Sequence, residues 1–167
     1  MNIETLLQDY AAYNLWANNL VADWLRPQSP ELLTRHAASS FSSLHDTLLH
    51  IWGAQDIWLI RLEGGSPTRF ISADFNGTTA EVLDGLLANS LKFKEFVAGQ
   101  NSTFFEQKSR YLHRNGNTYE EFNAQIIQHC LQHSTYHRGQ IVTIGRSLGL
   151  TDPPATDFIA YVRLQNT

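Results

Sequence analysis

Three histidines recur at intervals of four residues in the C-terminal part of the chain: His129, His133 and His137. In an α-helix, residues four apart stand one above the other on the same face, with Cβ atoms about 5–6 Å apart. Two imidazoles at that spacing can bind one metal ion, and His-x-x-x-His is a recurrent half-site for zinc and related ions. The spacing therefore predicts a metal half-site on a helix.

The two later histidines also lie on the apolar face of their helix. Apolar residues recur at steps of three and four, or sums of these, at Phe122, Ile126, Cys130, Ile141, Ile144 and Leu148. His133 and His137 fall within this series and are expected to point into the core, whereas His129 lies at its flank. A metal would satisfy both buried imidazoles, which if unpaired would cost about 1–3 kcal/mol each. Hydrogen bonds to core neighbours would do so too, so both interpretations stay open.

A zinc site on this helix needs a third ligand from elsewhere in the chain. The candidates in the sequence are His45, His50, His113 and Asp157. Burial favours His50, because its helical column is more apolar than that of His45.

Cys130 is a candidate fourth ligand, since it lies three residues before His133 on the same face. A lone buried cysteine is more often an inert core residue, and this is the interpretation that we favour. As the single cysteine of the chain, it also excludes an internal disulfide.

Composition narrows the class of protein. A chain of 167 residues with 43% hydrophobic residues can form one domain with a proper core. The net charge of −4, without a basic block, argues against nucleic acid as a partner. No apolar run of about 20 residues or signal-peptide pattern is present, so we expect no membrane segment and a cytoplasmic location.

Four long helices are expected from apolar periodicity and terminal signals. They cover residues 3–26, a stretch from the serines at 39–43 to about Glu63, 78–98, and 118 to about Gly149. Thr78-Thr79-Ala80-Glu81 and Thr118-Tyr119-Glu120-Glu121 read as capping boxes for the last two.

The other segments read as connections between these helices. Residues 103–117 contain Asn115-Gly116, a turn pair that favours a short hairpin or an extended crossover. The tail after Pro153-Pro154 is expected to form a turn or short helix on the bundle. The fold class is therefore all-α, a four-helix bundle with a long crossover or short hairpin between its third and fourth helices.

The sequence resembles the DinB/YfiT-like family across nearly the whole chain, residues 1–167. The resemblance is carried by four segments: residues 13–18 (YNLWAN), residues 47–54 with 58–62, His133-x-x-x-His137-Arg138-Gly139-Gln140-Ile141, and the closing residues 154–159. Their joint order is specific, although each segment alone is a weak signal.

The resemblance implies a four-helix bundle in which three histidines hold a divalent transition metal, zinc or nickel, often within a homodimer. Position by position, the ligands would be His50, His133 and His137. Characterised relatives include transferases and isomerases in which the metal activates a low-molecular-weight thiol. Others are described only as metal-dependent hydrolases or damage-inducible proteins.

No general base is evident from the motifs. In His-Glu-x-x-His peptidases a glutamate follows the first histidine, but Ser134 follows His133 here, which argues against a peptidase. Weak candidates for proton transfer or ligand support are His129, Tyr136, Gln140 and Asp157. Arg138 is expected to face outward or to cap a neighbour, and a ligand-binding role for it or for Arg61 is a second choice.

Two functions from different classes follow. The first is a metal-dependent enzyme acting on a small molecule, a hydrolase or a thiol-dependent transferase, because three neutral ligands leave a coordination position open. The alternative is a non-catalytic stress or interaction protein whose metal only stabilises the bundle.

Overall fold

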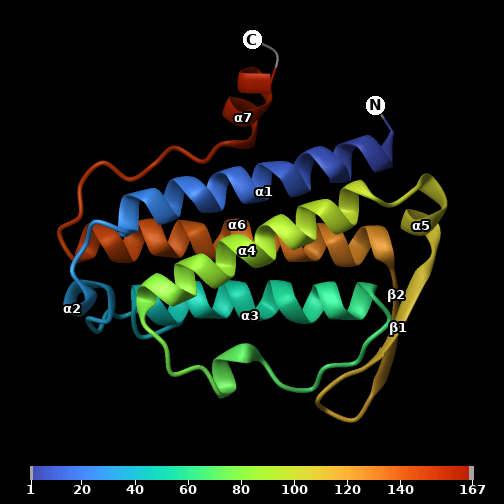
Figure 1. Cartoon of the computed structure of the whole chain (residues 1–167), viewed down its shortest axis with the longest axis horizontal. Coiled ribbons are helices and arrows are strands. Elements are labelled where there is room, and N and C mark those ends of the chain that lie inside the picture. The colour runs from blue at the N-terminus through green and yellow to red at the C-terminus, as the bar shows by residue number, and fades with distance from the viewer. Residues whose placement is uncertain (1, 166–167) are drawn as a thin grey trace.

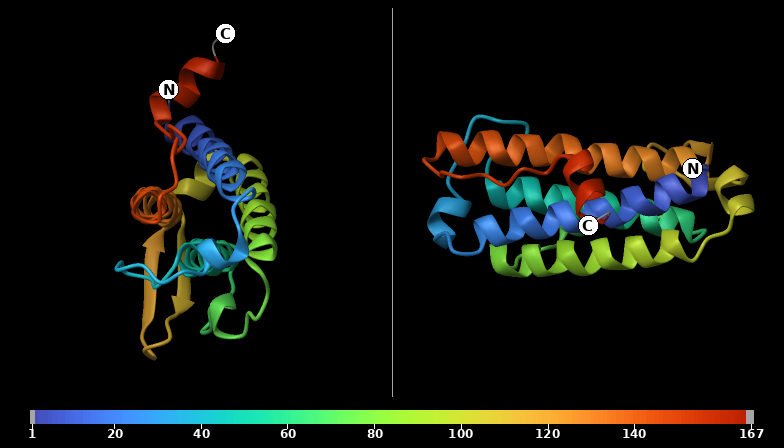
Figure 2. Two further views of the ribbon diagram at one scale, coloured as in Figure 1. Left: turned by 90° about the vertical axis from the view of Figure 1, so that its left-hand side faces the viewer. Right: turned by 90° about the horizontal axis from the view of Figure 1, so that it is seen from above.

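The computed structural model describes residues 2–165 and shows four long helices that lie side by side (Figure 1). These helices are α1 (Ile3–Leu25), α3 (Leu44–Leu62), α4 (Thr79–Ala98) and α6 (Asn123–Ser147). Both α1 and α3 pack against α4 and α6, so α1 and α3 occupy opposite corners of the bundle (Figure 2). The predicted four-helix bundle is confirmed.

Shorter elements lie at the ends and sides of the bundle. They are α2 (Pro30–Leu33), the 3-10 turn η1 (Ile71–Ala73), α5 (Ser102–Glu106), the strands β1 (Lys108–Leu112) and β2 (Thr118–Phe122), and α7 (Phe158–Gln165). The last of these packs on α1, away from α3 (Figure 1). Among the described residues, no helix combines the length and apolar character needed to cross a membrane.

Side-chain caps explain where two of the long helices begin. The Ser43 hydroxyl accepts a hydrogen bond from the Asp46 amide at the start of α3. Thr78 and Glu81 form the predicted capping box of α4, with the Thr78 amide donating to Glu81 Oε2 over 2.7 Å.

The second predicted capping box is wrong. Residues 118–122 form β2, which pairs antiparallel with β1 in the register Lys108↔Phe122 and Leu112↔Thr118. Gly116 takes a positive φ of 83° in the connecting turn, as the Asn-Gly pair predicted. Helix α6 therefore begins only at Asn123, and Phe122 is 43% exposed instead of lying on the core face.

The core consists of two apolar clusters separated by a polar layer. One cluster gathers residues such as Val21, Leu48 and Ile141, and the other gathers residues such as Leu7 and Leu131. Between them along the helices lie buried polar side chains that bond to one another: Asn14, Asn18, Gln55, Asn89, Ser90 and Arg138. This layer holds all four helices at the level of the histidines.

Candidate metal centre

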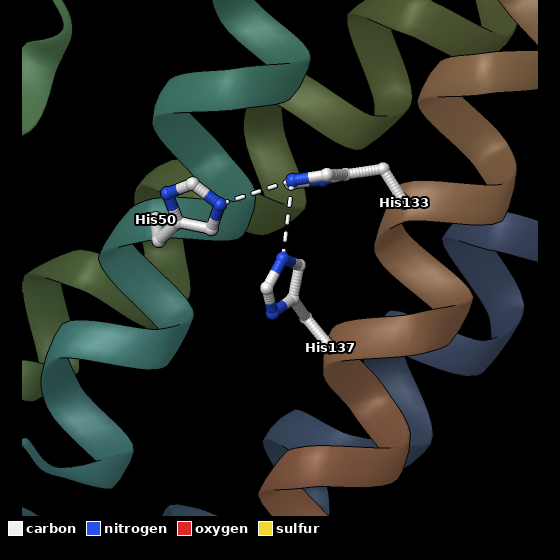
Figure 3. Close-up of side chains that lie close together, drawn as sticks. All are labelled: His50, His133 and His137. Atoms are coloured by element: carbon white, nitrogen blue, oxygen red, sulfur yellow. Dashed lines mark hydrogen bonds between the residues drawn. The ribbon is translucent and has the colours of Figure 1, made fainter. Parts of the chain in front are cut away.

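Three imidazoles from two helices converge on one point between α3 and α6. The Nε2 of His133 lies 3.0 Å from the Nε2 of His50 and 3.1 Å from that of His137. Figure 3 shows His50 on α3 pointing toward the two α6 histidines, which stand one turn apart. The ligand atoms of the three residues all lie within 4.8 Å of one another. The half-site expected from the spacing is thus joined by His50.

These separations fit a single small cation. Nitrogens bound to zinc at about 2.0–2.1 Å in tetrahedral geometry lie about 3.3 Å from one another. Hydrogen bonds alone do not satisfy the group, because the single Nε2 of His133 would have to serve both neighbours.

The electrostatics keep the imidazoles neutral, which is the form that binds metals. Burial, with His137 nearby, lowers the pKa of His50 from 6.5 to about 4. Burial, with the neighbouring His137, His50 and His129, lowers the pKa of His133 from 6.5 to about 3. Burial also lowers the pKa of His137, although its hydrogen bond to Gln140 acts in the opposite direction.

Gln140 orients His137 for this role. Its Oε1 accepts a hydrogen bond from Nδ1 of His137 over 2.7 Å, which leaves Nε2 of His137 with a free lone pair. The Gln140 amide nitrogen donates to Ser40 Oγ at 3.0 Å and to the Tyr136 hydroxyl at 3.1 Å, and this fixes which end of the amide faces the histidine. Gln140, one of the residues that the sequence suggested for ligand support, is therefore hydrogen-bonded to His137 of the cluster.

A family model for the DinB family matches residues 1–167. The chain belongs to the DinB family. Protein DinB of Bacillus subtilis (strain 168) is 23% identical over 162 residues, which span 93% of this chain and 92% of that protein.

Solved structures show the same DinB fold. A DinB-like protein from Bacillus cereus ATCC 10987 superposes with a TM-score of 0.68 at 18% identity, over 86% of this chain and 91% of that one. YfiT from Bacillus subtilis superposes with a TM-score of 0.65 at 9% identity, over 87% and 89% of the two chains. YfiT is described as a probable metal-dependent hydrolase with an unusual four-helix bundle topology.

In this DinB-family chain, the other residues considered as ligands lie outside the cluster. His45 contacts the Thr79 hydroxyl at 2.9 Å. Asp157 precedes α7 on the α1 side of the bundle, where its carbonyl accepts the Ala160 amide. Cys130 is 2% exposed within an apolar cluster, and burial raises the pKa of its thiol, as expected for an inert core residue.

A cavity of about 190 Å³ opens beside the cluster, and His50 and His133 form part of its wall. His129 also lines it, with its ring centroid 6.0 Å from that of His133 and 5.0 Å from Trp58. Tyr136 lies on the other side, where its exposed ring meets the edge of His137. His129 is therefore the predicted proton-transfer candidate that faces this cavity.

Phe41 is a site residue that sequence reasoning missed. Its ring stacks on His50 with centroids 4.2 Å apart and meets His137 at 5.6 Å. It comes from the connector before α3, where no periodicity marks buried positions. Only the tertiary packing identifies it.

The expectation that Arg138 faces outward is wrong. Arg138 is 2% exposed, and its guanidinium donates to Asn14 Oδ1 at 2.7 Å, Asn18 Oδ1 at 3.0 Å and Thr135 Oγ1 at 2.8 Å. Helix α6 packs against α1 as well as α3, so it has a second buried face, and Arg138 lies on it.

Proposed function

We propose that this protein is a metal-dependent enzyme that acts on a small molecule, with His50, His133 and His137 as ligands of one divalent transition metal, zinc or nickel. The observation that carries the proposal is the meeting of ring nitrogens from three histidines within 4.8 Å of one another, beside a cavity. Three neutral protein ligands with an open position are typical of catalytic metals, whereas structural zinc has four protein ligands.

The ion would supply a Lewis acid beside which a water or a thiol loses its proton near neutral pH. The chain itself supplies position and proton transfer. Phe41 covers one side of His50 and helps to exclude water there. Partial burial and then the charge of Arg61 lower the pKa of His129, so at neutral pH this imidazole can accept a proton.

Two reactions fit this arrangement, hydrolysis and the transfer of a low-molecular-weight thiol. Hydrolysis is supported by the likeness to YfiT. Thiol transfer is supported by the cavity that His50 and His133 share, whose described lining contains no carboxylate and offers His129 as the proton acceptor. A thiol held by the metal would be acidified by coordination and would release its proton to His129 or to water. We therefore favour the thiol as the nucleophile. The homodimer and cytoplasmic location stay predictions.

Metal analysis of protein purified without chelator tests the ligand set. We expect one divalent transition metal per chain, lost in His50→Ala, His133→Ala and His137→Ala. His36→Ala is the matched control, because His36 is exposed and outside the cluster. Metal retained in all three variants, or absent from the unmodified protein, would refute the ligand set.

Cobalt-substituted protein distinguishes the enzyme from the non-catalytic alternative. A thiol that enters an open position should add a sulfur-to-cobalt absorption band and change the visible spectrum. A spectrum indifferent to thiols and to pH would show a closed coordination sphere, and the metal would then only stabilise the bundle. A panel of thiols with electrophiles would follow for a responsive protein.

A further inference from the structure

Arg61, near the end of α3, is a buried cation to which the described residues offer no hydrogen-bond acceptor at Nε. Its side chain is 5% exposed, and its Nε has no hydrogen-bond partner among the described residues. No salt bridge joins it to a carboxylate in residues 2–165. Burial lowers the pKa of Arg61, and nearby Tyr111 and Glu121 only partly oppose this. A buried charge normally requires a paired and hydrogen-bonded partner.

Two aromatic rings fix the position of this guanidinium. Its central carbon lies 4.5 Å from the ring centroid of Trp58 and 4.1 Å from that of Tyr111. Such stacking favours the cation but satisfies none of its N–H groups. The rings thus hold the guanidinium in place and leave its hydrogen-bonding capacity unused.

Arg61 lines the same cavity of about 190 Å³ as His50 and His133. Arg114 lines it as well, stacked over Phe70 at 5.7 Å. No aspartate or glutamate belongs to this described lining, although the chain has 16 acidic residues against 12 basic ones. The cavity is therefore a cationic recess in an acidic protein.

We propose that Arg61 binds an oxyanion group of the substrate, a carboxylate or a phosphate, and holds it beside the three histidines. The planar fork of arginine matches both groups with two parallel hydrogen bonds. The cavity of about 190 Å³ has room for such a group beside the histidines. The role of the bound group in a reaction rests on the proposed function, whereas the binding of the anion by Arg61 does not.

Anion binding by the full-length metal-free protein tests the proposal without any assay of activity. The Nε–H signal of Arg61 is followed by nuclear magnetic resonance while sodium acetate or inorganic phosphate is added at constant ionic strength. We expect a saturable shift with at least one anion, and the tighter one identifies the group as carboxylate or phosphate. No saturable shift with either anion would overturn the proposal.

Matched variants assign the binding to Arg61. Arg61→Met should weaken it at least about tenfold, because a charge-assisted pair of hydrogen bonds is lost. Arg61→Lys should bind the anion with intermediate affinity, and it replaces Arg61→Met in the test if that variant does not fold. Arg110→Met is the control, since Arg110 is exposed on β1 outside the cavity lining. Equal affinity in Arg61→Met and the unmodified protein would refute the role.

Metal content, measured on the same samples, separates this proposal from the proposed function. Arg61→Met should keep its metal while losing the anion. An unmodified protein that binds the anion but no metal would support the Arg61 site and refute the metal-dependent enzyme.

Discussion

The Nδ1 atom of His137 lies 2.7 Å from Oε1 of Gln140, one turn further along α6. This hydrogen bond selects the tautomer in which Nε2 of His137 faces His133 and His50 with its lone pair. The amide is held in turn by Ser40, from the connector that precedes α3. Gln140 thus links the histidine cluster to the segment that covers it.

Gln140→Met is expected to weaken metal binding about 10–100-fold, because partners of ligating histidines fix the ring and raise its basicity. Competition with a chelator of known affinity measures the change. The matched control is Gln125→Met, an exposed glutamine on the same helix. If both variants bind metal as tightly as the unmodified protein, the hydrogen bond does not position His137.

The metal-free protein is expected to lose stability as the pH falls from about 6.5 toward 4. The unfolded chain takes up protons at histidines near pH 6.5, whereas His50 and His133 in the folded state do so only near pH 4 and 3. The unfolded state therefore binds more protons in this window, and the free energy of unfolding rises with pH.

Urea unfolding at a series of pH values measures this slope. His133→Gln removes one group with a lowered pKa, so its slope between pH 6.5 and 4 should be smaller, while the two proteins should run parallel above pH 7. Identical slopes throughout would contradict the burial of a neutral imidazole at position 133.

Arg138→Lys should lower the free energy of unfolding by about 2–3 kcal/mol. The two terminal guanidinium nitrogens of Arg138 reach Asn14, Asn18 and Thr135, and one lysine nitrogen cannot span these acceptors. Urea denaturation provides the measurement. Arg146→Lys, exposed at the end of the same helix, should stay within about 0.5 kcal/mol. A change in the free energy of unfolding that is similarly small for Arg138→Lys would show that the buried polar side chains rearrange to satisfy the lysine.

Alanine substitutions at two glycines inside helices should change the stability of the protein in opposite directions. A Cβ at Gly85 on α4 would overlap the Trp52 ring of α3, so Gly85→Ala should destabilise by about 1–3 kcal/mol. A Cβ at Gly139 on α6 would meet nothing within 4 Å, so Gly139→Ala should stabilise by about 0.5–1 kcal/mol. Thermal melting of both variants checks the pair, and stabilisation by both would show that the Trp52 ring moves easily.

The sequence alone determined most of the helices and placed two of the three clustered histidines on one helix face. Apolar periodicity and terminal signals placed helices close to Ile3–Leu25, Leu44–Leu62 and Thr79–Ala98. Helical geometry put His133 and His137 on one face, since four residues make about one turn. These features depend on neighbours within a few residues, which is why local patterns predict them.

Local patterns failed where a segment has a distant partner. Residues 118–121 match a capping box, but pairing with β1 satisfies their backbone and makes them a strand. Arg138 reads as a surface residue, but Asn14 and Asn18 of α1 supply the acceptors that allow its burial.

The sequence favoured His50 as the third ligand, but only the tertiary structure brought its ring to the α6 pair and Arg61 to the cavity beside them. Both residues lie on α3, so their distances from α6 depend on how these two helices pack. Residues far apart in the chain contribute to that packing. The spacing along one helix fixes directions around that helix alone. The position of a second helix relative to the first depends on the core that the four helices share.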